Sequence, residues 1–301
     1  MATEAQSHVE AAAATLAGGH EAQAATAARA EEQGHPEVPN FVELIISTRA
    51  VKDTPVAHYL HLAEPSIFSL IVVIILAVIA RAATRRMSKV PAGLQNFVEW
   101  ILGGLDTFFG SILGPRHGRR FLPLVGTLFI FIYLNNILGL VPFMKSPTSM
   151  PQTTFALAII VFFYVQILAV RELGIGGYLF HLAGEPRDVV GWVLSPLIFP
   201  LHIVGELAKP LSLGLRLFGN ILGEDILIGS FAMMGIMLIG VLGWHNPLVG
   251  IPLQTPFIFL ALLLSLIQAL VFSLLTTIYI LLVLPHEHEH EDHEEHEHAH
   301  M

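Results

Sequence analysis

Charged and amide side chains cluster in one stretch of the sequence whose surroundings are apolar. The stretch runs from Lys209 to Asp225 and reads KPLSLGLRLFGNILGED, so that it also contains Arg216, Asn220 and Glu224. A charged side chain in the middle of a bilayer costs at least about 2.5–3.5 kcal/mol and commonly marks an ion pathway. The residue types in this stretch suit charge stabilisation and proton exchange, so we take it as a candidate functional site.

Most of these polar side chains share one face if the chain is helical. At about 100° per residue, and with Arg216 at zero, the shared face covers positions within about 80° of that arginine. The residues on it, which we call the polar stripe, are His202, Glu206, Lys209, Ser212, Arg216, Asn220 and Glu224. Asp225 falls at about 180°, on the opposite face of the same helix.

Arg216 is suited to be a fixed positive charge rather than a proton carrier. Arginine keeps its charge under nearly all conditions, whereas a buried lysine loses its proton. Beside a mobile carboxylic acid, Arg216 would favour loss of that acid's proton. Asp225 would then serve a different aqueous path from the one that His202 and Glu206 serve.

Packing explanations compete with this hypothesis. Polar side chains in a membrane span also hold helices together, and this alternative applies to Asn135, Asn136, Gln166 and Gln268. Lys209 is explained more simply as an interfacial charge that snorkels to water. For Arg216 the alternative is a structural ion pair with Glu206 or Glu224.

The composition is that of an integral membrane protein. Of the 301 residues, 54% are hydrophobic and 13% are charged, and the mean hydropathy is +0.67, whereas soluble domains have about 25% charged residues. The absence of cysteine excludes disulfides and thiolate metal sites. No dinucleotide fingerprint, phosphate loop or nucleophile elbow is present, so these enzyme classes find no support.

Apolar runs predict the membrane helices, each of which needs about 20 residues to cross a bilayer. Four clear spans are expected at about 66–83, 121–143, 153–170 and 251–284. Residues 91–114 repeat apolar positions at helical spacing with polar residues between them, which favours an amphipathic helix in the interface. A Gly-rich connection is expected over 174–188.

Residues 189–242 form an apolar region too long for one upright crossing. A continuous helix of this length would run about 80 Å at 1.5 Å per residue. The region is therefore either two spans or one steeply tilted helix. Outside the membrane domain, 41–285, we expect a disordered or weakly helical tail over 1–40 and a disordered His/Glu-rich tail over 286–301. The second tail would chelate divalent ions weakly, although a solvated charged terminus is the simpler interpretation.

Lysine and arginine placement predicts the orientation. Residues 81–120 contain seven of them, so this segment is expected in the cytoplasm and the N-terminus outside. If 189–242 is one helix the C-terminus is cytoplasmic, and if it is two spans the C-terminus is outside. The last tail has neither lysine nor arginine, so charge counting does not decide.

The run from Pro210 to Asn220, PLSLGLRLFGN, resembles the signature of subunit a of the rotary proton-translocating ATP synthases. The resemblance extends over about 60–285 and includes Val90-Pro91, the Asn-rich end of the second span and Ile267-Gln268-Ala269. It implies an all-α membrane protein with five transmembrane helices and one interfacial amphipathic helix. The last two membrane helices would form a long tilted hairpin, with one helix over 189–242 and a cytoplasmic C-terminus.

The resemblance also implies a role for each matching polar residue. Arg216 matches the arginine that faces the carboxylates of a ring of c subunits and blocks proton short-circuit. Asn220 and Gln268 match polar residues near it. Asp225 matches a position where the family commonly has an acid, and its neighbour Glu224 could share that role.

Some positions depart from the family's pattern. His202 stands where many members have glutamate, and Glu206 lies one turn later on the same face, so the exit-side carboxylate has moved rather than vanished. Ala261 replaces a common histidine or glycine in the final span, and Gly139 stands where some members have an acid. The inlet path would then be built from Glu224, Asp225, Asn135, Asn136 and water.

The sequence thus predicts a proton-translocating stator subunit in a bacterial inner membrane, non-catalytic and without cofactor or metal. Its expected partners are the c-ring, the peripheral-stalk b subunits and lipid, with no nucleic acid and no small-molecule substrate other than protons. The alternative is an independent secondary transporter or ion channel. Such transporters usually contain inverted repeats, and no such repeat is visible in the sequence.

Overall fold

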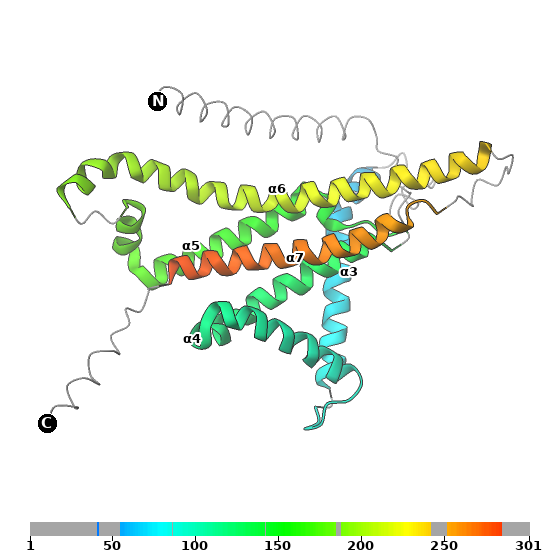
Figure 1. The fold of residues 1–301 in the computed structure, drawn as a ribbon, viewed down its shortest axis with the longest axis horizontal. Coiled ribbons are helices and arrows are strands. Elements are labelled where there is room, and N and C mark those ends of the chain that lie inside the picture. Colours follow the sequence, from blue (N-terminus) through cyan, green and yellow to red (C-terminus); the bar gives the residue numbers. More distant parts are fainter. Residues whose placement is uncertain are drawn as a thin grey trace, which may run out of the picture. The chain divides into compact units, whose positions relative to one another are not determined.

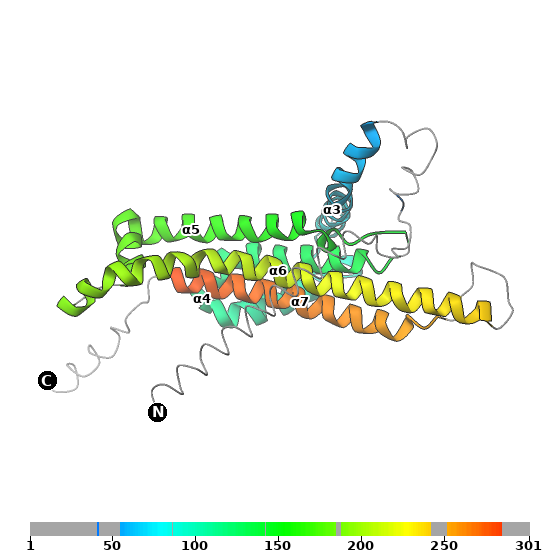
Figure 2. The same cartoon turned by 90° about the horizontal axis from the view of Figure 1, so that it is seen from above.

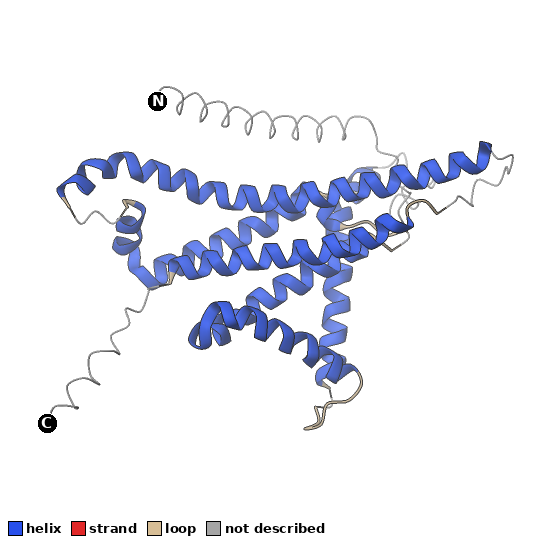
Figure 3. Ribbon diagram, viewed as in Figure 1, coloured by secondary structure: helices blue, strands red, loops and turns tan. Residues whose placement is uncertain are grey.

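The structure is a computed structural model that describes residue 41 and residues 55–85, 87–141, 143–184, 188–241 and 252–284. Its elements are α3 (Pro55–Thr84), α4 (Leu94–Leu138), the short 3₁₀ helix η1 (Pro147–Ser149), α5 (Pro151–Leu182), α6 (Val189–Val241) and α7 (Thr255–Val283) (Figure 1). Within these ranges no strand occurs (Figure 3). The prediction of an all-α fold is confirmed, while the two predicted tails lie outside the described residues.

Six helical segments are long and apolar enough to cross a membrane by length and composition. They are Ala63–Thr84, Leu94–Gly114, His117–Leu138, Pro151–Leu182, Gly191–Ile239 and Thr255–Val283. Five of them correspond to the predicted membrane helices. The other, Leu94–Gly114, has the lowest mean hydropathy of the set, 1.2, and its position in the interface stays a prediction.

The described residues form two units. One contains 41–223 with 259–284, and the other contains 224–241 with 252–258. α6 is one helix of 53 residues that continues from the first unit into the second. The alternative of two separate spans over 189–242 is therefore wrong, and the tilt of α6 against a membrane stays a prediction.

Gly114 separates the two predicted halves of α4. Its φ of 73° and ψ of 168° are not helical, and a positive φ is readily adopted by glycine alone. The first half buries Leu105, Phe109 and Leu113, which recur every four residues and so form one face. The ring of Phe109 meets that of Phe129 in the second half, with centroids 6.4 Å apart.

The prediction of a Gly-rich connection over 174–188 is wrong for its first part. α5 remains helical to Leu182, with one interruption at Gly174, where φ is 71° and ψ is 165°. The prediction relied on three glycines within residues 174–177 and gave too little weight to the apolar residues that follow them. A single glycine with positive φ is enough to turn the chain, so the residues beyond it can return to a helix.

Within the first unit, α5 and α7 lie along the first part of α6 (Figure 1 and Figure 2). α6 contributes Leu213, Leu217 and Ile221 to the shared core, again at four-residue spacing. Gly214 lets α5 approach closely, because a Cβ there would lie 2.9 Å from Cδ1 of Phe155. This packing fixes which face of α6 is buried, and so which face is left for the polar stripe.

Candidate functional site

Arg216 is exposed on α6 although the helix around it is apolar. The buried Leu213, Leu217 and Ile221 lie on the core side of α6, and Arg216 and Asn220 have exposed side chains. A guanidinium carries five N–H donors and keeps its charge. The helix therefore presents a permanent cation on its exposed face, beside Ser212 and Asn220.

Asn220 is linked to Gln268 by a hydrogen bond between two helices. The Nδ2 of Asn220 donates to Oε1 of Gln268 over 2.6 Å, which joins α6 to α7. Gln268 is only 3% exposed, and its Nε2 has no hydrogen-bond partner within the described part of the chain. The bond satisfies the buried oxygen of Gln268 and the amide nitrogen of Asn220, one turn of helix beyond Arg216.

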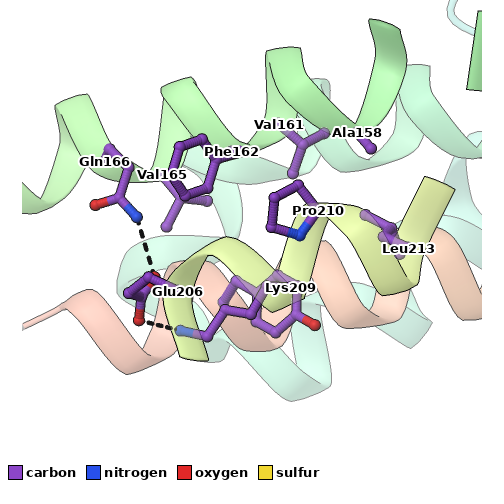
Figure 4. Close-up of a pocket in the computed structure, with 10 residues that line it drawn as sticks. Ala158, Val161, Phe162, Val165, Gln166, Glu206, Lys209, Pro210 and Leu213 are labelled. Atoms are coloured by element: carbon purple, nitrogen blue, oxygen red, sulfur yellow. Dashed lines mark hydrogen bonds and ion pairs between the residues drawn. The ribbon is translucent and has the colours of Figure 1, made fainter. Parts of the chain in front are cut away.

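Glu206 is engaged on both carboxylate oxygens (Figure 4). Its Oε1 accepts a short ionic hydrogen bond from Lys209, one turn along α6. Its Oε2 accepts from Nε2 of Gln166 on α5 over 3.0 Å. The carboxylate of Glu206 thus binds Lys209 and Gln166. The structure therefore does not support a structural ion pair between Glu206 and Arg216. Lys209 is therefore ion-paired, while its place at the membrane interface stays a prediction.

These side chains line a small pocket between helices. Apolar residues of α5 and α6 form most of its wall, with Gln166, Glu206, Lys209 and Tyr279 as the polar members. The Nζ of Lys209 lies 5.3 Å from the centre of the Tyr279 ring on α7, within the range of a cation–π contact. Three helices therefore meet around the Glu206–Lys209 pair.

His202 lies at the other end of the polar stripe, exposed but fixed. Its Nδ1 is 3.0 Å from the backbone oxygen of Leu182, and because a carbonyl can only accept, the contact requires the hydrogen on Nδ1. The ring of His181 stacks on that of His202 with centroids 6.5 Å apart.

Glu224 and Asp225 belong to the second unit. Both are partly buried, and Oε2 of Glu224 is buried without a hydrogen-bond partner among the described residues. In the same unit Phe231 stacks on Phe257 with centroids 4.1 Å apart, which joins the end of α6 to the start of α7.

A buried polar network lies where α4 ends, and sequence reasoning found only half of it. Asn135 and Asn136 are 0% and 2% exposed. Thr148 donates to Oδ1 of Asn136 over 2.6 Å, and Ser146 donates to the backbone oxygen of Asn135 over 3.1 Å. The hydroxyl residues come from the turn around η1, where serine and threonine are ordinary loop residues, so no local pattern pointed to them.

Gly139 explains why no acid stands in that part of the second span. A Cβ at Gly139 would lie 2.7 Å from Cβ of Ser146 and 3.1 Å from its backbone nitrogen. The turn carrying Ser146 therefore occupies the space that a longer side chain would need.

Comparison with known proteins covers most of the chain. The sequence model of the family described as ATP synthase A chain matches residues 66–281. The chain is 46% identical to ATP synthase subunit a of Protochlamydia amoebophila over 252 residues, covering 84% of this chain and 91% of that protein. It is 40% identical to ATP synthase subunit a of Solidesulfovibrio magneticus over 215 residues, covering 71% and 81%, and 37% identical to that of Aliarcobacter butzleri over 210 residues, covering 70% and 84%.

Proposed function

Because the chain belongs to the ATP synthase A chain family, we propose that it is the stator half of a rotary motor, in which Arg216 separates two aqueous half-channels to the c-ring. Family membership gives the chain a role in the proton-translocating sector of ATP synthase. It is accordingly a multi-pass membrane protein and a component of a larger complex. Proton flow past Arg216 would drive the ring and thereby ATP synthesis in the catalytic head.

The observation that carries this proposal is the exposed Arg216 in the middle of a long, mostly apolar helix. A permanent cation at membrane depth is expensive, and the described residues provide no carboxylate bound to Arg216, which favours a partner on another subunit. A ring carboxylate meets that need, because it would be held ionised beside the guanidinium and could take up a proton only after moving away. The same cation repels protons between the two half-channels, which prevents a short-circuit.

The two half-channels would use different parts of α6. His202 and Glu206 supply the exit side, where an imidazole nitrogen and a carboxylate are available for proton exchange. Glu224 and Asp225 supply the inlet side, together with the buried Asn135 and Asn136. Asn220 and Gln268 would keep the turn of helix next to Arg216 polar and fixed.

The surroundings of the subunit complete the proposal. Its partners would be the c-ring and the peripheral-stalk b subunits in a bacterial inner membrane, with the N-terminus outside and the C-terminus in the cytoplasm. The subunit would have no catalytic site, cofactor or metal of its own. Protons are the proposed coupling ion, and residues 41–285 the membrane domain between tails 1–40 and 286–301.

Reconstitution separates this proposal from an independent transporter or channel. Vesicles would carry either the chain alone, the c-ring alone, or both with the stalk subunits, and a potassium diffusion potential would drive protons across. We expect proton flux only where chain and ring are together. Rapid proton flux through the chain alone would overturn the proposal and favour an independent channel.

A further inference from the structure

The end of α5 is folded back upon itself at Gly174. Tyr178 follows Gln166 by twelve residues, which along a straight helix is about 18 Å at 1.5 Å per residue. The Tyr178 hydroxyl nevertheless donates to Oε1 of Gln166. The non-helical Gly174, with φ of 71°, turns the chain at this point. We call residues 175–182, which follow the turn, the return segment, because Tyr178 within it reaches back to Gln166.

The Tyr178 hydroxyl determines which way the Gln166 amide points. An amide has an oxygen that only accepts and a nitrogen that only donates. Since the oxygen accepts from Tyr178, the nitrogen faces the other way and donates to Oε2 of Glu206 over 3.0 Å. Lys209 holds the second oxygen of the same carboxylate. The orientation of Glu206 therefore depends on Tyr178 through the amide of Gln166.

The other end of the return segment contacts His202. The backbone oxygen of Leu182 is 3.0 Å from Nδ1 of His202, and the His181 ring stacks on the imidazole. Gly184, just beyond, also lies tightly on α6, because a Cβ there would be 2.8 Å from Cγ2 of Ile198. The return segment thus contacts His202 directly and is linked to Glu206 through Gln166.

We propose that Tyr178 and Gln166 are positioning residues of the exit half-channel, and that the return segment holds Glu206 and His202 in the geometry that accepts protons on their way to the cytoplasm. This inference rests on the proposed function, because it concerns the exit path of the same motor. Proton exchange between a carboxylate and water needs the carboxylate at a fixed distance and angle. The amide carries no proton itself; its role is to aim Glu206.

The test is a double-mutant cycle read as passive proton flux. Vesicles containing the assembled membrane sector, with the catalytic head removed, would be driven by a potassium diffusion potential. Tyr178→Phe removes one hydroxyl, and the loss of a hydrogen bond in such a chain predicts a flux lower by about threefold to tenfold. Glu206→Gln should lower the flux at least as much. In the Glu206→Gln background, Tyr178→Phe should have no further effect, because its target is gone.

Two variants keep the result specific. Tyr164→Phe alters an exposed tyrosine of the same helix and should leave the flux unchanged. Gln166→Leu should lower the flux as much as Tyr178→Phe does. Combining the two substitutions should cause no additional loss. If Tyr178→Phe fails to assemble, the flux of Gln166→Leu tests the positioning role instead. The inference is overturned if Tyr178→Phe conducts like Tyr164→Phe, or if it lowers flux equally with and without the Glu206 carboxylate.

The complete complex carrying Arg216→Ala, with its catalytic head retained, is measured alongside and separates the two claims. If Arg216→Ala still couples ATP hydrolysis to proton pumping, the proposed function itself fails. If Arg216→Ala abolishes coupling while Tyr178→Phe and Gln166→Leu have normal flux, only the positioning role fails. Loss of ATP-driven pumping in Arg216→Ala supports the proposed function. Lower passive flux in Tyr178→Phe and Gln166→Leu, with the expected non-additivity, supports the positioning role.

Discussion

The Nδ2 of Asn220 and the Oε1 of Gln268 are 2.6 Å apart, and their hydrogen bond joins α6 to α7 one turn of helix beyond Arg216. The two residues are 48 positions apart in the sequence, so only the fold brings them together. An amide–amide bond in a helix interface both satisfies polar groups and fixes the rotation of one helix against the other. The contact thereby controls the direction in which Arg216 projects.

Removing either amide of this pair should damage coupling, and removing both should cost little more. Gln268→Leu removes the acceptor of the Asn220 amide, a loss of about 0.5–1.5 kcal/mol for one hydrogen bond, and should lower ATP-driven pumping severalfold. The double variant with Asn220→Leu should resemble the worse single variant. Gln152→Leu, an exposed glutamine at the start of α5, is the control. Additive losses would show that the two amides act separately.

Gly214→Ala should destabilise the packing of α5 on α6. The new Cβ would lie 2.9 Å from Phe155, and overpacking of this kind costs about 1–3 kcal/mol. Gly205→Ala is the matched control on the same helix, because nothing lies within 4 Å of its Cβ position. Thermal unfolding of the purified complex in detergent measures the difference. Equal midpoints for the two variants would contradict the close approach of Phe155.

Gly174→Ala should loosen the return segment. A non-glycine residue at positive φ costs about 1–2 kcal/mol, and the relaxed chain would straighten the end of α5 and withdraw Tyr178. Hydrogen exchange of the amides in residues 175–182 should then become faster than in the parent protein. Gly176→Ala has a helical φ and no atom within 4 Å of its Cβ, so it should exchange like the parent. Unchanged protection in Gly174→Ala would contradict the folded-back geometry.

Deleting residues 286–301 should leave proton pumping intact. The segment is a run of histidines and acids after the last apolar span, and a solvated charged terminus makes no contribution to a path through the membrane. ATP-driven acidification of vesicles, with and without added zinc, is the measurement. A loss of pumping on deletion would give the tail a function that the proposed mechanism lacks.

The sequence predicted those features that depend on local pattern. Apolar periodicity located the membrane helices, and helical spacing gathered Arg216 and Asn220 on one face, which is the exposed face of α6 in the structure. Length alone left residues 189–242 open between two spans and one helix. The resemblance to a known family favoured one helix, and the structure contains one.

Contacts between distant residues could not be predicted in the same way. The return of α5 depends on the backbone angles of Gly174, and glycine in a sequence indicates freedom to turn but not the direction of the turn. Tyr178 therefore looked like part of a loop, and Gln166 like a packing residue. The hydrogen bond from Thr148 to Asn136 likewise depends on the turn around η1 coming back to the end of α4.

The proposed role of Arg216 as the fixed cation between the two half-channels is tested most directly by ATP-driven proton pumping of the complete complex carrying Arg216→Ala. We expect pumping to fall to background while the c-ring still co-purifies in normal amount. The reason is that the ring carboxylates lose the fixed cation that makes them release their protons. Arg216→Lys should also fail, because lysine is a compact point charge that loses its proton when buried. Pumping retained by Arg216→Ala in an assembled complex would contradict the account.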